Sequence, residues 1–266
     1  MTIAFNHLGR LGQLGNQMFQ YAALKGIAER HGYDFMIPNN KDVMVDSLGN
    51  KLRTELFDAF DLDVKVGILQ TENYLQEPHY EYSVDLVNNC PDNFSLWGFF
   101  QTEKYFKHIE DQIRKDFTFK KQIRDECEEI IEEVFDNPIA LHVRRGDFLI
   151  NHANHHNLSM DYYAEALSKF DKKRQVVVFT DDPKWAFEQE LFADDRFVIS
   201  NEVGPYHDLY LMTQCDDFII ANSTFSWWGA WLANRGTVIA PKKWFGPNNI
   251  DKNTDDLYPP HWRIIE

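Results

Sequence analysis

From Pro138 onward the chain alternates between short apolar runs and segments with helical periodicity. The apolar runs, which we expect to be strands, cover residues 139–143, 175–180, 196–200, 218–221 and 237–240. Helices are expected between them, near Ser159, Asp182, Tyr206 and Trp227. Strands that alternate with helices are joined by crossover connections, so they form a parallel sheet with helices on both faces. The sequence therefore predicts a doubly wound α/β domain for residues 137–266.

The first half of the chain has a less regular pattern. Strands are expected at residues 3–5, 34–38 and 96–100. A helix should run from about Asn16 to His31, where Gly32 provides a C-terminal stop. Residues 39–92 show little periodicity and are expected to consist of loops and short elements. An amphipathic helix over residues 121–136 ends this half, so we assign residues 1–136 to a first domain.

Charge and cysteine content narrow the class of protein. The 27 lysines and arginines are outnumbered by 42 acidic residues, which gives a formal net charge of −15. This balance argues against a nucleic-acid partner, because affinity for a phosphate backbone comes from a basic surface. The 3 cysteines are far apart and lack metal-type spacing, which indicates reduced thiols in a soluble, cytoplasmic protein. No apolar run approaches the roughly 18 residues that span a bilayer, so any membrane association would be peripheral.

The first strand of the second half runs directly into two arginines. His142 lies within the apolar run, and Arg144, Arg145 and Asp147 follow it. In open α/β sheets, ligands bind beyond the carboxyl ends of the strands. Paired guanidinium groups at such a position favour an anionic ligand, most simply a phosphate held by two parallel hydrogen bonds. A solvated Arg–Asp turn is the alternative.

Two further segments should reach the same edge of the sheet. Asp181 follows the second strand, and its carboxylate suits the ring N–H and the exocyclic amine of guanine. At the start of the last helix, an amide, hydroxyls and free backbone N–H groups favour an anion. The polar residues of this cluster are Asn222, Ser223, Thr224 and Ser226. Helix capping explains Asp182, Ser223 and Thr224 equally well, and both roles can coexist. Three such segments at one edge predict a site for a nucleoside diphosphate.

Several other motifs are absent from the sequence or unconvincing in it. The chain has no G-x-x-x-x-G-K-[ST], G-x-S-x-G or G-x-G-x-x-G, which argues against P-loop enzymes, α/β-hydrolases and dinucleotide-dependent oxidoreductases. Asp61 and Asp63 match the D-x-D of some metal-dependent glycosyltransferases, but an acidic chain contains such pairs by chance. The histidines at residues 152–156 lie in an asparagine-rich run typical of a loop. We therefore expect no metal site and no cofactor.

Three longer motifs occur in order along the chain. They are residues 12–22 (GQLGNQMFQYA), 142–147 (HVRRGD) and 222–232 (NSTFSWWGAWL). Together they resemble the α-1,2-fucosyltransferases of glycosyltransferase family 11, although the arginine motif alone is shared with other fucosyltransferases. The resemblance implies a GT-B fold, in which two Rossmann-like domains face a central cleft. It also implies GDP-fucose as donor substrate, a galactoside or lipid-linked glycan as acceptor, inversion at the anomeric carbon, and no required metal.

The resemblance also implies roles for the residues at the donor site. Arg144 would neutralise the β-phosphate of the departing GDP, an electrostatic role that a metal ion performs in other enzymes. His142 and Arg145 would lie beside the pyrophosphate, and Asp181 would bind guanine. The cluster from Asn222 to Ser226 would hold phosphate or ribose.

On the acceptor side the motifs leave alternatives open. Gln13, Asn16 and Gln17 would face the acceptor and bind sugar hydroxyls, or they cap and solvate the start of their helix. An inverting transfer needs a group that takes the acceptor's proton, and Asp147 is the candidate base. The alternative for Asp147 is an ion pair that orients Arg144 or Arg145. At the level of function, the alternatives are a fucosyltransferase of other linkage or acceptor, and a nucleotide-binding module without catalysis.

Overall fold

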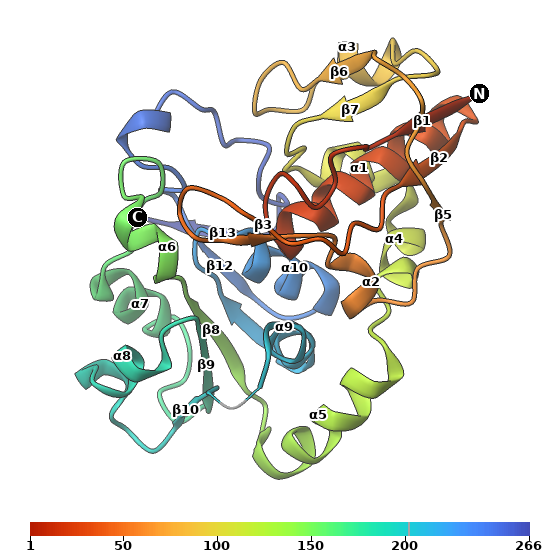
Figure 1. Cartoon of the computed structure of the whole chain (residues 1–266). Coiled ribbons are helices and arrows are strands. Elements are labelled where there is room, and N and C mark those ends of the chain that lie inside the picture. The colour runs from red at the N-terminus through yellow and green to blue at the C-terminus, as the bar shows by residue number, and fades with distance from the viewer. Residues whose placement is uncertain (202) are drawn as a thin grey trace. The chain divides into compact units, whose positions relative to one another are not determined.

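The computed structural model describes residues 1–201 and 203–266, which form two compact units (Figure 1). The first unit comprises Met1–Lys120 together with Asp251–Pro259, and the second comprises Lys121–Ile250 together with Pro260–Glu266. Each unit has its own parallel β-sheet with helices packed against it. The α/β fold class predicted from strand–helix alternation is confirmed.

The first unit is built on a five-stranded parallel sheet with the order β5-β2-β1-β7-β6. Its strands are β1 (Thr2–Ala4), β2 (Asp34–Ile37), β5 (Lys65–Val66), β6 (Tyr74–Gln76) and β7 (Ser95–Trp97). Between β2 and β5 the chain forms a small antiparallel pair, β3 (Met44–Val45) with β4 (Lys51–Leu52). The strand order reverses direction between β1 and β7. The three strands predicted for this half are β1, β2 and β7, and the irregular segment contains only short elements, as expected.

The long helix of the first unit is buried on nearly every side. The helices of this unit are α1 (Leu14–His31), α2 (Leu56–Ala59), α3 (Val84–Asn88) and α4 (Glu110–Asp116), with single 3₁₀ turns η1 (Glu103–Tyr105) and η2 (Lys107–Ile109). Gly32 adopts φ 64° and ψ 35°, the left-handed conformation that ends α1 as predicted. Phe19, Tyr21 and Leu24 point in different directions around α1, yet all are fully buried. A helix buried all round has no apolar stripe to detect.

The second unit contains a six-stranded parallel sheet with the order β10-β9-β8-β11-β12-β13. Its strands are β8 (Ile139–Val143), β9 (Val176–Thr180), β10 (Phe197–Ile199), β11 (Asp217–Ile219), β12 (Val238–Pro241) and β13 (Arg263–Ile265). Numbered by appearance, this order is 3-2-1-4-5-6, the Rossmann arrangement. The first five strands were predicted. The edge strand β13 was not, because it has only three residues and two of them, Ile264 and Ile265, are apolar, which is too short a run to indicate a strand.

Helices cover both faces of this second sheet. They are α5 (Lys121–Val134), α6 (Gly146–Ile150), α7 (Met160–Leu167), α8 (Pro183–Phe187), α9 (Pro205–Gln214) and α10 (Thr224–Ala233), with 3₁₀ turns η3 (Glu190–Phe192) and η4 (Pro247–Asn249). Asp182 caps α8 as predicted, since its Oδ1 accepts a hydrogen bond of 3.2 Å from the Trp185 N–H. Trp227 and Trp228 of α10 are fully buried. These two rings make α10 a core helix of the unit.

The two units differ from the predicted domains in two segments. α5, which the prediction placed in residues 1–136, packs against α9 and belongs to the second unit. His207 of α9 also contacts Glu126 of α5, with 2.6 Å between Nε2 and Oε2. Residues 251–259 return to the first unit, where Asp256 Oδ2 accepts a hydrogen bond of 3.0 Å from the Tyr82 N–H. Such contacts join segments far apart in sequence, so local periodicity gives no sign of them.

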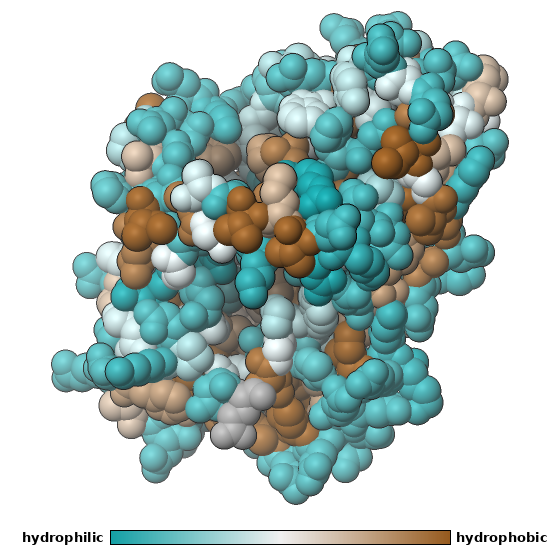
Figure 2. Space-filling model, in the orientation of Figure 1, coloured by the Kyte–Doolittle hydropathy of each residue, from teal (hydrophilic) through white to brown (hydrophobic). Residues whose placement is uncertain are grey.

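Within the described part of the chain, no helix is both long enough and apolar enough to cross a bilayer. Apolar side chains that reach the surface include Val45, Ile150 and Ile250. On the face that Figure 2 shows, apolar side chains stand singly or in small groups among polar ones. Scattered exposure of this kind is ordinary for globular proteins and does not mark a binding surface.

Candidate active site

The carboxyl ends of three adjacent strands define one edge of the second sheet. β8 pairs with β9 over its whole length, from Ile139 opposite Val176 to Val143 opposite Thr180, and with β11 on its other side. The strand order reverses between β8 and β11, and open α/β sheets bind ligands at such a point. The three segments predicted to converge therefore begin on neighbouring strands.

Asp181 fixes the backbone of the loop that follows β8. The Arg145 N–H donates a hydrogen bond of 2.8 Å to Asp181 Oδ1. A Cβ atom on Gly146 would lie only 2.5 Å from Asp181 Oδ2, so this carboxylate can come so close only because residue 146 is glycine. The turn into α6 is therefore held by a side chain from the neighbouring strand's end.

Arg144 lies between two carboxylates. Its Nη2 is 2.5 Å from Asp147 Oδ1, and its Nη1 is 2.7 Å from Asp181 Oδ2. The guanidinium carbon lies 5.4 Å from the centre of the Phe148 ring. A guanidinium has five N–H groups, and these two ion pairs leave others available for an anion. The side chain is about one-fifth exposed, so it is partly shielded from water and held in a defined orientation.

Arg145 is held by a different pair of groups. Its Nε donates a hydrogen bond of 3.1 Å to Asp182 Oδ2, and its guanidinium carbon lies 3.9 Å from the centre of the Trp185 ring. Stacking on an aromatic ring orients a guanidinium while leaving its edge N–H groups free to bind. Trp185 therefore belongs to the site although no sequence motif pointed to it.

His142 is a buried, neutral group beside the arginines. Burial, and next the positive charge of Arg144, lower the pKa of His142 to about 3. Its ring lies 5.6 Å from that of Phe225 on α10. Among the described residues Nδ1 has no hydrogen-bond partner, and a buried polar atom left in this state needs an explanation.

Asn222 holds two loops together. Its Nδ2 donates hydrogen bonds of 2.8 Å to the carbonyl oxygens of His156 and Trp244. The first carbonyl belongs to the loop between α6 and α7, and the second to the loop after β12. The side chain is buried, with 3% of its surface exposed. In this structure the side chain of Asn222, which was predicted to bind the ligand, holds these two loops in position.

The hydroxyl residues of the same motif divide into two kinds. Ser226 is fully buried, and its Oγ lies 3.4 Å from the Ala221 carbonyl oxygen and 3.3 Å from that of Ser223. Ser223 and Thr224 are partly exposed where α10 begins. Ser223 makes no capping hydrogen bond through its side chain within the described chain, so the capping alternative proposed for it is not observed. These two hydroxyls are therefore the accessible ones.

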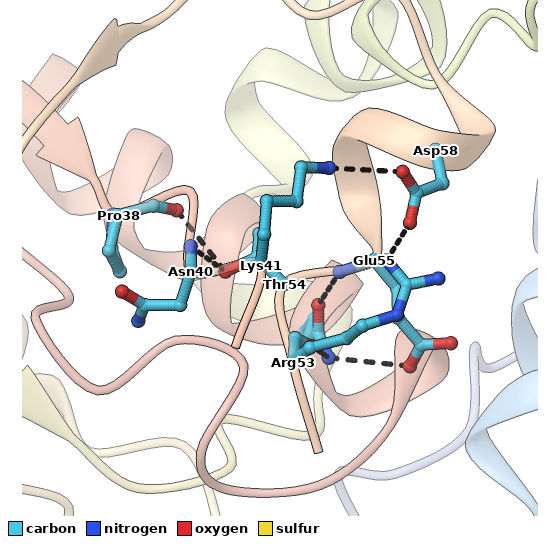
Figure 3. A network of polar contacts seen from close by, with 8 residues as sticks. Pro38, Asn40, Lys41, Arg53, Thr54, Glu55 and Asp58 are labelled. Atoms are coloured by element: carbon cyan, nitrogen blue, oxygen red, sulfur yellow. Dashed lines mark hydrogen bonds and ion pairs between the residues drawn. The ribbon is translucent and has the colours of Figure 1, made fainter. Parts of the chain in front are cut away.

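On the first sheet, Gln17 is a buried structural residue. Its Nε2 donates to the carbonyl oxygens of Arg53 and Gly12 at 2.9 and 3.2 Å, and its Oε1 accepts from the Glu55 N–H at 2.8 Å. Figure 3 shows the segment that it anchors, in which Arg53 and Asp58 form an ion pair. A side chain with 0% exposure whose amide is already bonded at both ends is not placed to receive a sugar.

Asn16 and Gln13 are more accessible than Gln17. Gln13 is exposed and precedes the first residue of α1, without a side-chain capping bond in the described chain. Asn16 is half-buried, and its Oδ1 accepts a hydrogen bond of 2.7 Å from Gln101 Nε2. Gln101 in turn accepts one of 2.5 Å from the Tyr80 hydroxyl. The structure thus separates the three predicted acceptor residues into one buried anchor and two accessible amides.

Glu77 is a half-buried carboxylate that no sequence motif indicated. It follows β6 at the carboxyl edge of the first sheet, in a segment without useful periodicity. Burial raises the pKa of Glu77 to about 7, despite opposing hydrogen bonds from the backbone N–H groups of Phe99 and Phe100. The carboxylate thereby links the end of β6 to the turn after β7.

The class of protein follows from these observations. Two parallel α/β units, one of them with the Rossmann strand order and an arginine-lined edge at its reversal point, constitute a GT-B type fold. Among solved structures, POFUT1 in complex with GDP-fucose has a TM-score of 0.59 at 13% identity, covering 90% of this chain and 97% of that one. NodZ α-1,6-fucosyltransferase soaked with GDP-fucose has a TM-score of 0.54 at 16% identity, covering 87% and 92%. At these identities the likeness establishes the fold alone.

The chain belongs to glycosyl transferase family 11, whose family model matches residues 3–266. It is therefore a glycosyltransferase. One relative is the O-antigen biosynthesis glycosyltransferase WbnK of Escherichia coli, which is 32% identical over 93% of this chain and 97% of its own length. An alpha-1,2-colitosyltransferase of Escherichia coli is 31% identical over 96% and 97%. Galactoside alpha-(1,2)-fucosyltransferase 1 of Leontocebus fuscicollis is 27% identical over 85% and 65%.

Proposed function

We propose that the protein transfers L-fucose from GDP-β-L-fucose to the 2-hydroxyl of a terminal galactoside with inversion, in cytoplasmic synthesis of a surface glycan. The observation that carries the proposal is the arginine loop at the reversal point of the second sheet, in a chain that matches family 11 from residue 3 to residue 266. The α-1,2 linkage is supported by the relatives named for it. The acceptor would be a galactoside or a lipid-linked glycan.

The chemistry asked of the donor site is stabilisation of a leaving group. As the bond from the anomeric carbon to the GDP oxygen breaks, negative charge grows on the β-phosphate. Arg144 is already oriented by two carboxylates, so its remaining N–H groups need no reorganisation to meet this charge. Arg145 would contact the same pyrophosphate from its place on Trp185, and the neutral His142 would provide a hydrogen bond. We propose that these residues serve without a metal ion or a cofactor.

The remaining donor contacts are proposed from the polar ends of β9 and β11. Ser223 and Thr224 would bind phosphate or ribose together with the free N–H groups of α10, while the buried Ser226 would shape the turn. Asp181 is proposed to bind guanine. Both of its oxygens already have partners in the arginine loop, so each would have to accept a second hydrogen bond, which carboxylate oxygens can do.

Asp147 was the predicted base, and its geometry favours the other role considered for it. The carboxylate forms an ion pair of 2.5 Å with Arg144. Taking up a proton would neutralise Asp147 and weaken the ion pair just when Arg144 must neutralise the departing phosphate. We therefore propose that Asp147 orients Arg144.

A second candidate reaction is α-1,2-colitosyl transfer. The relative that carries this name matches 96% of the chain at 31% identity, so it supports the colitosyl reaction about as well as other relatives support the fucosyl one. Colitose is fucose without its 3-hydroxyl, and the two reactions share every feature of the arginine loop. Only a contact to that hydroxyl would separate them. A fucosyltransferase of other linkage, or a binding module without catalysis, is the remaining alternative.

The test is an incubation with GDP-fucose and a panel of β-galactosides in the presence of EDTA, with GDP-colitose as a parallel donor. GDP release is followed, and the product linkage is assigned by NMR. An α-1,2-fucosylated galactoside formed in EDTA is the expected result. If GDP-colitose turns over faster than GDP-fucose, colitose would replace fucose in the proposed function, and the proposed α-1,2 linkage would stand. Binding of GDP without transfer to any acceptor would favour the non-catalytic alternative.

A further inference from the structure

We propose that Trp185 and Asp182, at the start of α8, are positioning residues that fix the guanidinium of Arg145 and thereby set the affinity for the nucleoside diphosphate. This inference rests on the function proposed above. Arg144 pairs with two carboxylates, whereas Arg145 pairs with one carboxylate and an aromatic ring. Both groups that hold Arg145 come from α8, one from its N-cap and one from its first turn.

The turn from β9 into α8 holds Asp182 in one place. The Asp182 N–H donates a hydrogen bond of 3.1 Å to Thr180 Oγ1, and Pro183 provides the fixed φ of the first helical position. Asp182 Oδ1 accepts the Trp185 N–H at 3.2 Å, as the oxygen of an N-cap residue does. The other oxygen, Oδ2, lies 3.1 Å from Arg145 Nε. One carboxylate therefore joins the start of α8 to the arginine loop.

The ring of Trp185 is a platform for the guanidinium of Arg145. The indole packs against the buried core of the second unit, whose members include Tyr163 and Val178. The guanidinium carbon of Arg145 lies 3.9 Å from the ring centre, within the distance at which a cation is attracted to an aromatic face. Because the ring is itself held by the core, it limits the positions that the guanidinium can take.

The outer end of the Arg145 side chain is the part that can bind an anion. Asp182 contacts Nε, and among the described residues neither Nη1 nor Nη2 of Arg145 has a hydrogen bond or an ion pair. These two nitrogens carry the fork of N–H groups that matches two phosphate oxygens. The side chain is 23% exposed, so the fork can be reached by a ligand.

Holding this side chain in advance should strengthen binding of the pyrophosphate. A mobile arginine loses rotamer freedom when its fork binds an anion, and that loss lowers the affinity. The stacking on Trp185 and the hydrogen bond to Asp182 remove part of this freedom before a ligand binds. The two residues therefore act through Arg145, so their effect on affinity should depend on the presence of that side chain.

Two other roles for these residues would give different results. Trp185 could stack directly on the guanine base, in which case its effect would not need Arg145. The ring face that carries the guanidinium is not open to a base, which argues against this role. Asp182 could serve only as the cap of α8, in which case any other good cap would replace it. Both roles can be separated from positioning by experiment.

A double-mutant cycle on GDP binding tests the role of Trp185. Titration calorimetry with GDP compares the wild type with Trp185→Leu, Arg145→Ala and the double variant. We expect Trp185→Leu to weaken GDP binding roughly 10-fold, the scale of a cation–π contact shielded from water. In the Arg145→Ala background the same change should have little further effect. Trp185→Phe, which keeps an aromatic face, should recover most of the affinity.

Asp182→Ser separates capping from positioning. A serine hydroxyl is also a good cap for α8, but it is uncharged and too short to contact Arg145 as well. We expect this variant to unfold in urea near the wild-type midpoint and to bind GDP several-fold more weakly, with no further loss when Arg145 is absent. Phe197→Leu is the matched control, because Arg196 stacks on Phe197 at 4.6 Å, at the amino ends of the strands. This control should bind GDP with wild-type affinity.

The outcomes distinguish the positioning role from the function on which it rests. Equal losses from Trp185→Leu with and without Arg145 would overturn the positioning role and indicate direct stacking on the base. Wild-type GDP affinity in Asp182→Ser would reduce Asp182 to a helix cap. If Trp185→Leu fails to fold, Trp185→Phe and Asp182→Ser carry the cycle in its place. Failure of the wild type to bind GDP would instead contradict the proposed function.

Discussion

Arg144 and Asp181 form an ion pair of 2.7 Å that joins the carboxyl ends of β8 and β9. The same carboxylate accepts the Arg145 N–H through its other oxygen. One aspartate therefore sets both the backbone of the arginine loop and the direction of its first guanidinium. The edge proposed to bind the pyrophosphate is therefore already ordered, and under this proposal the charge that it offers needs no rearrangement during the reaction.

Replacement of Arg144 tests the leaving-group role. We expect Arg144→Ala to lower kcat roughly 100-fold or more, because one key electrostatic donor to the transition state contributes about that much. Arg144→Lys should recover only part of the loss, since an ammonium group cannot contact both carboxylates and a phosphate with the same planar geometry. Steady-state kinetics of GDP release measures both variants. Arg196→Ala is the control. Arg196 lies directly before β10, at the amino ends of the strands and away from the arginine loop, and its guanidinium packs on the Phe197 ring. Near-normal kcat in Arg144→Ala would rule out the phosphate role.

Two roles for Asp181 can be separated by comparing nucleotides. If Asp181 reads guanine, Asp181→Ala should weaken GDP binding while leaving ADP binding nearly unchanged. If it mainly orients Arg144, both nucleotides should lose affinity equally. We expect a loss for both, with a further loss of about 1–3 kcal/mol specific to GDP, the scale of buried hydrogen bonds to a charged partner. Titration calorimetry with the two nucleotides measures the difference. Asp181→Asn keeps an acceptor for the Arg145 N–H and isolates the effect of charge.

The three amides at the start of α1 should respond differently to alanine substitution. Gln17→Ala leaves the Glu55 N–H and the Arg53 carbonyl without their partners, so the free energy of unfolding should fall by about 1–3 kcal/mol. Gln13→Ala should leave stability unchanged because that side chain is exposed. Asn16→Ala should raise the KM for the acceptor with little change for the donor. Urea unfolding and initial rates measure these effects. Equal stability of the Gln17 and Gln13 variants would contradict the anchoring role.

Much of the second unit could be predicted from the sequence because each of its signals is local. β8 and β9 are largely apolar runs. The start of α8 is indicated by two adjacent residues, Asp182 and Pro183. The neighbouring positions of the arginine loop and Asp181 then follow from strand adjacency in a parallel sheet. The sequence could not reveal that Trp185 stacks on Arg145, because that contact depends on the path of a loop.

The first unit was less predictable because its determinants are long-range. Gln17 lies in a motif and resembles a ligand residue in sequence, but its partners are 36 and 38 residues away. Glu77 lies among short elements without periodicity, and the two N–H groups that it binds belong to a turn 22 and 23 residues further on. The one available signal was the glycine at position 98, directly after an apolar strand. A glycine there indicates close approach of another group.

Protonation of His142 should make folding depend on pH. The pKa of His142 is about 3 in the folded protein and near 6.5 when the side chain is free, so the unfolded chain binds more protons between these values. Neutral His142 therefore makes its full contribution to the free energy of unfolding above pH about 6.5. This contribution is lost progressively as the pH falls toward about 3. Each factor of ten in proton affinity corresponds to about 1.4 kcal/mol, so the loss should reach several kcal/mol.

Urea unfolding of the wild type and of His142→Phe across this pH range measures the loss as a difference between the two proteins, which cancels the titration of the other groups. His156→Phe is the control, because the less buried His156 should show a smaller effect. A difference curve for His142→Phe that is flat between these pH values would show that the ring is not held neutral.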